Sequence, residues 1–148
     1  MSTISKKRNW DRKLNIIFGI ADQTTVSALP VYGRSAVKAP TLLRLAEEGA
    51  VFENAYCNSP LCGLFRTSMM TGLLPFKAGG YDNAHDFPST LPTFTHYMPL
   101  GWYLTSLSGK IHFTWPDQQH GFEERLTTDI YHSDFGWTQN WGEPGETR

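Results

Sequence analysis

The sequence contains no long apolar run and no excess of charge of one sign. No stretch approaches the roughly 20 apolar residues that a helix needs to span a bilayer. The 13 Lys and Arg residues balance 14 Asp and Glu residues, which gives a formal net charge of -1. Such a balance provides no strong field that would attract nucleic acid or an anionic membrane. We therefore expect neither a membrane nor a nucleic acid among the partners.

Cysteine is scarce, since Cys57 and Cys62 are the only two in 148 residues. Two cysteines without an export signal do not make a disulfide scaffold. The apolar run at residues 14–21 follows basic residues, as the core of a signal peptide would. It meets Asp22 at once, however, and no small-x-small cleavage site follows. We therefore expect two thiols and a cytoplasmic protein.

Apolar and aromatic residues are plentiful by contrast, at 40% and 14% of the chain. A chain of this length and composition can bury the core of one globular domain. A basic cluster lies within residues 1–13, and such clusters are typically solvated. The sequence therefore predicts a basic N-terminal lead-in over residues 1–13 and a folded region over residues 14–148.

Strand-like and helix-like segments alternate along the first half of the chain. The segment "LNIIFGIAD", residues 14–22, predicts a parallel strand buried on both faces that delivers Asp22 to its C-terminal edge. Open α/β sheets bind their ligands at that edge. Apolar residues at helical spacing predict a helix that begins near Pro40 and stops at Gly49. Residues 50–57 then resemble a second strand.

The alternation continues in the second half. Residues 66–75 predict a short helix closed by Gly72, and a further helix precedes a strand over residues 104–107. Pro99 conflicts with that further helix, because a proline in a helix interior removes a hydrogen bond. From Thr114 onward the pattern is loop-like. Together these segments predict an α/β fold with a mostly parallel sheet flanked by helices, and at least two strands of such a sheet would be missing from so short a chain.

Cys62 and Arg66 lie where a loop leads into a predicted helix. The helix dipole and the free backbone donors favour an anionic nucleophile or an anionic ligand there, and Arg66 lies one turn further on the same face. A buried structural cysteine is the plain alternative. The three residues between Cys62 and Arg66 are too few for a thiol phosphatase loop. A zinc site would need further ligands, and none is apparent near Cys57 and Cys62.

Five motifs follow one another in the order and with the spacing of a known family. They are "ADQ" at 21–23, "AYCNSPLC" at 55–62, "YDNA" at 81–84, "SGKIHF" at 108–113 and "DQQHGFEERLTTDIY" at 117–131. Together they resemble the N-terminal part of the type I sulfatases of the alkaline phosphatase superfamily, most specifically the choline-sulfatase branch. The resemblance runs from Leu14 to about Trp141. It implies an alkaline-phosphatase-like sulfatase fold whose C-terminal portion is absent, so that the chain is a fragment.

The resemblance also implies a reaction, the hydrolysis of choline sulfate to choline and sulfate. In this family a cysteine at the position of Cys62 is oxidised to formylglycine, whose hydrate attacks the sulfur and then expels sulfate by re-forming the aldehyde. Arg66 matches the arginine that stabilises the formylglycine. Lys110 and His112 match the pair that contacts the sulfate and assists the leaving oxygen. Such charges suit a sulfate transition state.

A divalent metal is the implied cofactor, with Ca²⁺ as the first choice and Mn²⁺ or Mg²⁺ as alternatives. Asp22 matches a carboxylate ligand, and the formylglycine derived from Cys62 would be another ligand. Gln23 stands where many sulfatases carry a second aspartate, so it is also assigned to the metal shell. His120 lies in a motif that would line the substrate pocket. Full-length relatives are expected to be homo-oligomers.

The motif "CGLFR" departs from the Cys-x-Pro-Ser-Arg pattern that directs formylglycine formation in the family. Leu64 stands in place of the proline and Phe65 in place of the serine. The alternative to an active sulfatase is therefore a catalytically inactive, sulfatase-like fragment or partial gene product. Hydrolysis of phosphate or phosphonate esters on the same scaffold is a third possibility.

Overall fold

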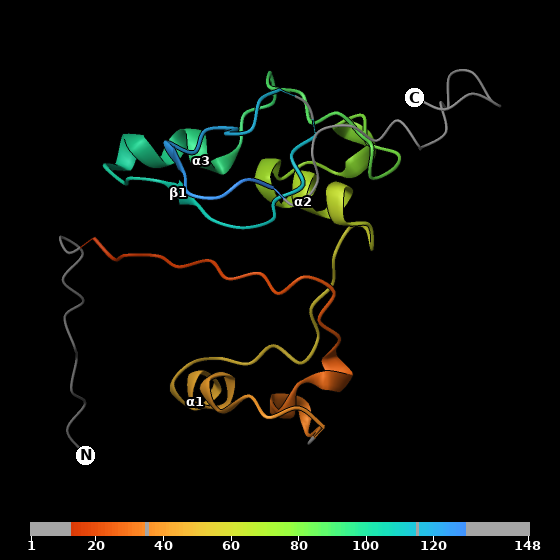
Figure 1. The fold of residues 1–148 in the computed structure, drawn as a ribbon, viewed down its shortest axis with the longest axis vertical. Helices are drawn as coiled ribbons and strands as arrows, with labels where there is room; N and C mark the ends of the chain where they lie inside the picture. The colour runs from red at the N-terminus through yellow and green to blue at the C-terminus, as the bar shows by residue number, and fades with distance from the viewer. Residues whose placement is uncertain (1–12, 35, 115, 130–148) are drawn as a thin grey trace, which may run out of the picture. The chain divides into compact units, whose positions relative to one another are not determined.

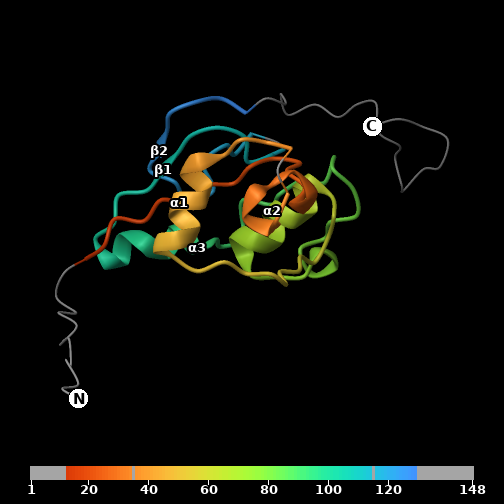
Figure 2. The same ribbon diagram turned by 90° about the horizontal axis from the view of Figure 1, so that it is seen from below.

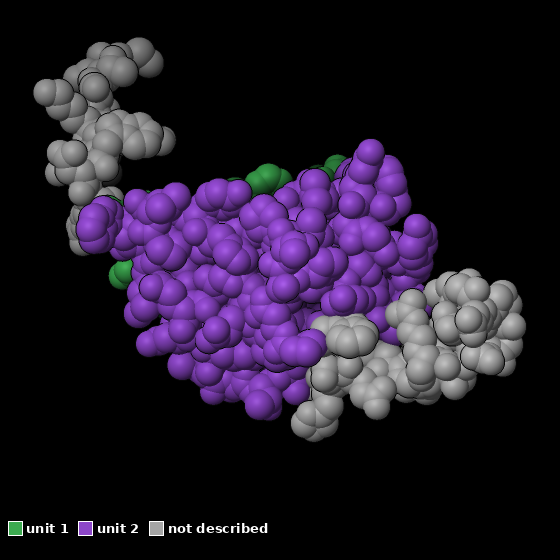
Figure 3. Space-filling model, turned by 90° about the horizontal axis from the view of Figure 1, so that it is seen from above, with its two compact units in different colours: residues 1–54 green, residues 55–148 purple. Residues whose placement is uncertain are grey.

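The computed structural model describes residues 13–34, 36–114 and 116–129. The chain divides into two compact units, unit 1 (residues 1–54) and unit 2 (residues 55–148), which Figure 3 distinguishes by colour. The predicted lead-in lies outside the described residues apart from Lys13, and the boundary at residue 13 stays a prediction. Within those three ranges, no helix is long and apolar enough to cross a membrane.

Unit 1 is built from short helical elements joined by extended chain (Figure 1). Its elements are the 3-10 turns η1 (Val26–Ala28) and η2 (Pro30–Tyr32) and the helix α1 (Pro40–Glu48). α1 begins at Pro40, whose fixed φ suits the first position of a helix. It ends at Gly49, where a Cβ atom would lie 2.9 Å from the Leu45 carbonyl oxygen. The helix predicted between Pro40 and Gly49 is thus confirmed.

The buried strands predicted over residues 14–22 and 50–57 are wrong. Both segments lack strand structure, and Figure 1 draws them without arrows. Ile17 is 97% exposed, Phe52 is 73% exposed and Tyr56 is 93% exposed. An apolar β-branched segment becomes a strand only when a neighbour pairs with its backbone and other side chains cover its faces. Among the described residues, no strand pairs with either segment.

Unit 2 carries the remaining elements and every buried side chain among the described residues. Its elements are α2 (Cys62–Thr71), η3 (Pro75–Lys77), α3 (Phe94–Tyr97), η4 (Met98–Gly101), β1 (Ser106–Leu107) and β2 (Glu124–Arg125). α2 ends as predicted, because Gly72 adopts the left-handed conformation with a φ of 74° and its N–H donates to the Ser68 carbonyl. It begins at Cys62, four residues before the predicted start at Arg66.

The conflict at Pro99 is resolved by a change of helix type. α3 stops at Tyr97, and η4 begins at Met98 with Pro99 in its first turn, where a missing N–H breaks no intrahelical bond. The chain then turns at Trp102, which has a φ of 60°. The helix predicted before β1 is therefore two short pieces instead of one.

β1 and β2 pair in parallel, and Figure 2 shows them side by side. Ser106 is opposite Glu124, and Leu107 is opposite Arg125. β1 occupies the end of the strand predicted over residues 104–107. β2 falls in the stretch that was predicted to be loop-like, so that prediction is wrong at these two positions. A strand of two residues is too short to leave an alternating pattern in the sequence.

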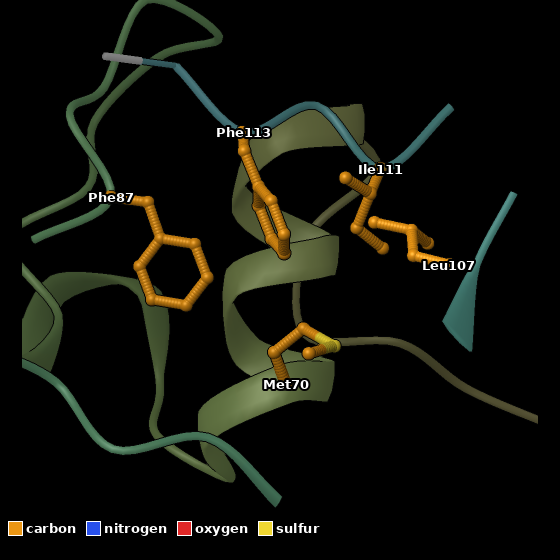
Figure 4. Close-up of a cluster of buried hydrophobic side chains, with 5 residues drawn as sticks. All are labelled: Met70, Phe87, Leu107, Ile111 and Phe113. Atoms are coloured by element: carbon orange, nitrogen blue, oxygen red, sulfur yellow. The ribbon is translucent and has the colours of Figure 1, made fainter. Parts of the chain in front are cut away.

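The core of unit 2 joins α2 to the segment that follows β1. Met70 on α2 packs with Phe87, Leu107, Ile111 and Phe113, as Figure 4 shows. The rings of Phe87 and Phe113 meet edge to face with their centroids 5.5 Å apart. Burying each of these side chains stabilises the fold by about 1.5–3 kcal/mol. The same contacts join the C-terminal half of α2 to the segment of residues 107–113.

Candidate active site

The N-terminus of α2 presents Cys62 as its first helical residue. Both cysteines are free thiols, as the sequence predicted, and Cys62 is half-buried. The next backbone N–H, that of Gly63, donates to Oδ1 of Asn83 over 3.0 Å. A Cβ atom at Gly63 would lie 3.3 Å from Cδ2 of His112, so the absence of a side chain lets His112 approach the helix closely. The N-terminus of α2 therefore lies next to His112, one of the predicted catalytic residues.

Arg66 lies one turn further along α2 and is buried, with only 4% of its surface exposed. Its Nη1 donates to the Lys110 carbonyl oxygen over 2.6 Å. A short bond from a charged donor is stronger than a neutral one. This bond ties α2 to the backbone of the "SGKIHF" loop. Cys62, Arg66, Lys110 and His112, which were predicted from motifs far apart in the sequence, therefore share one region of unit 2.

His112 is buried and held in an uncommon backbone conformation, with a φ of 65°. A residue with a side chain in the left-handed region costs about 1–3 kcal/mol and persists only where its surroundings hold it. Its Nε2 lies 3.0 Å from the Asn83 carbonyl oxygen, which can only accept, so the neutral ring carries its proton on Nε2. Burial lowers the pKa of His112, and the positive charges of Lys110 and Arg66 act in the same direction.

Sequence reasoning missed two residues that organise this region. Asn83 contacts both Gly63 and His112, one through its side chain and the other through its backbone. Its only signal was its place in the "YDNA" motif. Asp129 accepts backbone hydrogen bonds from Ile111 and His112. It lies within the longest of the five motifs, but no spacing connects it to a loop 17 residues earlier.

His120 is packed inside the core of unit 2. Its ring stacks on Phe87, with centroids 4.1 Å apart, and meets Phe113 edge to face at 4.4 Å. Neither ring nitrogen has a hydrogen-bond partner among the described residues, and Nδ1 lies 3.7 Å from Oδ2 of Asp117. Burial lowers the pKa of His120. The substrate-binding role of His120 stays a prediction, and its surroundings are those of a core side chain.

The backbone of residue 120 is held as firmly as its ring. The hydroxyl groups of Thr93 and Thr95 both donate to the His120 carbonyl oxygen, over 2.7 and 2.8 Å. Both threonines are buried at the start of α3. This double contact stabilises the left-handed backbone at His120, which has a φ of 42°.

Asp22 and Gln23 lie in unit 1, and both are exposed. Gln23 also has a left-handed backbone, with a φ of 54°. Within the described parts of the chain, no group of three or more His, Cys, Asp or Glu side chains could hold a metal ion. These residues therefore do not by themselves fit a divalent cation, which takes about six to eight oxygen ligands when it is Ca²⁺. The metal roles of Asp22, Gln23 and residue 62 stay predictions.

Most of the chain matches a known protein family. The sulfatase family model covers residues 14–146, so this chain belongs to the sulfatase family. The predicted resemblance is thereby confirmed. Among individual relatives, the choline-sulfatase of Rhizobium meliloti (strain 1021) is 48% identical over 134 residues, which are 90% of this chain and 26% of that protein. The N-acetylglucosamine-6-O-sulfatase of Bacteroides thetaiotaomicron is 30% identical over 122 residues, which are 82% of this chain and 22% of that protein.

A solved structure shares the fold. The structure of BT4656 in complex with its substrate D-glucosamine-2-N,6-O-disulfate superposes with a TM-score of 0.62 at 31% sequence identity, over 67% of this chain and 20% of that one. The predicted α/β sulfatase fold with parallel strands and flanking helices is confirmed by this likeness and by the β1–β2 pair. The chain spans about a quarter of the length of the curated relatives just named. Members of the family generally use a metal and a formylglycine.

Proposed function

We propose that this chain forms part of the active site of a sulfuric ester hydrolase that converts choline sulfate and water to choline and sulfate. The observation that carries the proposal is the convergence of Cys62, Arg66, Lys110 and His112 around the N-terminus of α2. The bond from Arg66 to the Lys110 carbonyl and the contacts through Asn83 hold this group together. The 48% identity to a choline-sulfatase supports the choice of substrate.

Residue 62 supplies the nucleophile in this proposal. A formylglycine at this position contributes a hydrated aldehyde in place of a thiol. The half-buried start of α2 suits it, because the positive end of the helix dipole favours developing negative charge. The Arg66 guanidinium, one turn away and bound to the loop, adds positive charge and stabilises the modified residue.

Lys110 and His112 act on the sulfate group and on the leaving oxygen. The Lys110 ammonium offsets the negative charge of the sulfate oxygens. His112 is held beside the helix mouth and keeps the proton of its neutral ring on Nε2, against the Asn83 carbonyl. A lowered pKa keeps the ring neutral at neutral pH, so Nδ1 can accept the proton that the attacking hydrate at residue 62 releases and give it to the departing oxygen.

A divalent metal is part of the same proposal. Asp22 and Gln23 offer carboxylate and amide oxygens, which suit Ca²⁺ first and Mn²⁺ or Mg²⁺ as alternatives. The family generally uses a metal, and this supports the assignment. Two side chains and residue 62 fall short of a full coordination shell, so the described residues do not supply the site on their own. His120 as part of the substrate pocket, the cytoplasmic location and the homo-oligomeric state stay predictions.

A catalytically inactive chain is the second candidate, and one observation favours it. Leu64 replaces the proline of the maturation motif and is buried. A Cβ atom at Gly80 would lie 2.4 Å from Cδ2 of Leu64, so this leucine is closely packed against the Gly80 backbone. The leucine that distinguishes "CGLFR" from the family motif is therefore part of the packed interior of unit 2. If the maturation machinery does not accept this motif, residue 62 remains a thiol.

The test uses the whole protein that carries this chain, with Cys62→Ala as the matched control. Mass spectrometry of the peptide that contains residue 62 distinguishes a thiol from an aldehyde. Sulfate release from choline sulfate is measured in parallel, together with hydrolysis of a phosphate ester of the same alcohol. Aldehyde with sulfate release that Cys62→Ala abolishes supports the proposal. A thiol without turnover supports the inactive candidate, and preference for the phosphate ester supports the third possibility.

A further inference from the structure

The pairing of β1 with β2 has a fixed offset in the sequence. Ser106 is opposite Glu124 and Leu107 is opposite Arg125, so that partners are 18 residues apart in both cases. The strands themselves cover only two residues each. Backbone pairing of parallel strands normally ends where the ladder ends, and the following N–H groups must then find other acceptors.

The same offset continues beyond the ladder through side chains. The backbone N–H of Gly109 donates to Oγ1 of Thr127 over 2.6 Å, and the N–H of Ile111 donates to Oδ2 of Asp129 over 3.0 Å. Both pairs are again 18 residues apart. The side-chain oxygens of Thr127 and Asp129 thus take the place that backbone carbonyls hold within the sheet. They carry its register into the loop that contains two predicted catalytic residues.

Asp129 makes the stronger of these two attachments. Its Oδ2 also accepts the N–H of His112 over 2.6 Å, so one carboxylate oxygen receives two consecutive backbone donors. Asp129 is buried, and Nη2 of Arg125 lies 3.4 Å from the same oxygen. Hydrogen bonds to an ionised, buried acceptor are stronger than bonds between neutral groups. This pair of bonds is well placed to hold the left-handed backbone of His112.

The loop is attached on its other sides as well. The side chains of Ile111 and Phe113 are buried in the core, so the residues on both sides of His112 are anchored. Arg66 holds the Lys110 carbonyl from α2. Without Asp129, these contacts would still hold the loop near the helix. The peptide groups at 111 and 112 would lose their acceptor, and the His112 side chain would then be held mainly by the bond from its Nε2 to the Asn83 carbonyl.

We propose that Asp129 is a positioning residue, which fixes the backbone of residues 110–112 so that Lys110 and His112 face the reacting sulfate ester. The inference rests on the proposed function for its catalytic part, because the reaction is what the two side chains would serve. Its structural part, the control of the loop by one carboxylate, is independent of the substrate.

The test compares three variants of the whole protein that carries this chain. Asp129→Ala removes both backbone bonds, and Asp129→Asn keeps the shape and one accepting oxygen without the charge. Thr127→Val is the matched control, since it removes only the bond to Gly109 on the same extension of the sheet. Amide hydrogen exchange of residues 109–112 measures how firmly the backbone of the loop is held. The values of kcat and KM for choline sulfate measure the reaction.

We expect exchange at Ile111 and His112 to accelerate by about tenfold or more in Asp129→Ala, with a smaller acceleration in Asp129→Asn. We expect Thr127→Val to accelerate exchange at Gly109 alone. In the reaction, kcat should fall about 10- to 100-fold in Asp129→Ala, less in Asp129→Asn, and KM should change little. If Asp129 only stabilised the fold, its substitution would lower the amount of active protein. The kcat of the remaining folded protein would then not fall further in Asp129→Ala than in Asp129→Asn.

Three outcomes overturn some part of the inference. Unchanged exchange at Ile111 and His112 in Asp129→Ala overturns the positioning role and leaves the proposed function untouched. Faster exchange with an unchanged kcat overturns the catalytic part alone. A parent protein that hydrolyses no sulfate ester overturns the proposed function and the catalytic part with it, while the exchange data still decide whether Asp129 holds the loop.

Discussion

Unit 1 and unit 2 differ in how their apolar residues are used. In unit 1, none of the described side chains is buried, and segments as apolar as residues 14–20 are exposed. In unit 2, a cluster around Met70 and Phe113 excludes water and joins α2 to the loop after β1. Local preference is therefore enough to form an element such as α1, whereas a site with fixed geometry requires a core beneath it.

The largest difference in stability between the two units should come from truncating a buried aromatic side chain. Phe113→Ala removes a side chain that is 2% exposed, and we expect it to lower the free energy of unfolding of unit 2 by about 3–5 kcal/mol. Ile17→Ala is the matched change in unit 1, where the side chain is 97% exposed, and it should stay within about 0.5 kcal/mol. Urea unfolding followed by tryptophan fluorescence measures both. Equal losses would contradict the comparison.

The packing of the two units can also be compared by adding a methyl group at one glycine in each unit. Gly80→Ala places a Cβ 2.4 Å from Cδ2 of Leu64 and 3.0 Å from Cδ2 of His85, so we expect a loss of about 1–3 kcal/mol. Gly19→Ala in unit 1 meets no atom within 4 Å and should cost nothing measurable. Combining Gly80→Ala with Leu64→Ala should cost less than the sum of the two, because the second change removes the clash. Simple additivity of thermal unfolding shifts would refute the close packing of Leu64.

The pH dependence of stability should also distinguish the units. Burial lowers the pKa values of His112 and His120, both in unit 2, whereas residues 1–54 contain no histidine. Below the ordinary histidine pKa of about 6.5, the unfolded chain binds protons that the folded chain does not. The free energy of unfolding of unit 2 should therefore be complete above about pH 6.5 and decrease as the pH falls.

The measurement for this effect is the urea midpoint of unit 2 between about pH 8 and pH 5. His120→Phe keeps an aromatic ring against Phe87 and removes the buried base, so the midpoint should depend less on pH in this variant. A midpoint that rises as the pH falls, or an unaltered slope in His120→Phe, would show that the buried imidazoles do not control it.

The smallest expected change in stability concerns the C-terminal end of α1. Gly49→Ala places a Cβ 2.9 Å from the Leu45 carbonyl, which must shift, and we expect the last turn of the helix to fray at a cost of about 1 kcal/mol or less. Backbone chemical shifts of residues 45–49 measure the fraying, with Pro40→Ala at the other end of the helix as the control. Loss of the core of unit 2 in this variant would contradict the local character of α1.

Sequence reasoning predicted the elements that local chemistry controls. The helix from Pro40 to Gly49 and the left-handed Gly72 that ends α2 follow from proline and glycine at the positions where helices accept them. The candidate site was predicted through Cys62, Arg66, Lys110 and His112, which the structure brings together in unit 2. Strands were predicted poorly, because an apolar segment does not reveal whether a partner pairs with it.

The amino-acid sequence alone was enough to predict the family, both ends of α1 and the end of α2 at Gly72. It also pointed to Cys62, Arg66, Lys110 and His112 as candidate site residues, since motifs and local conformational preferences are written along the chain. Only the tertiary structure decided that Asn83 links Gly63 to His112, that Asp129 carries the register of β1 and β2 into the loop, and that His120 lies between two phenylalanine rings. Each of these contacts joins residues 17 or more positions apart or depends on burial. Such contacts arise only when the packed core brings distant segments within hydrogen-bonding distance.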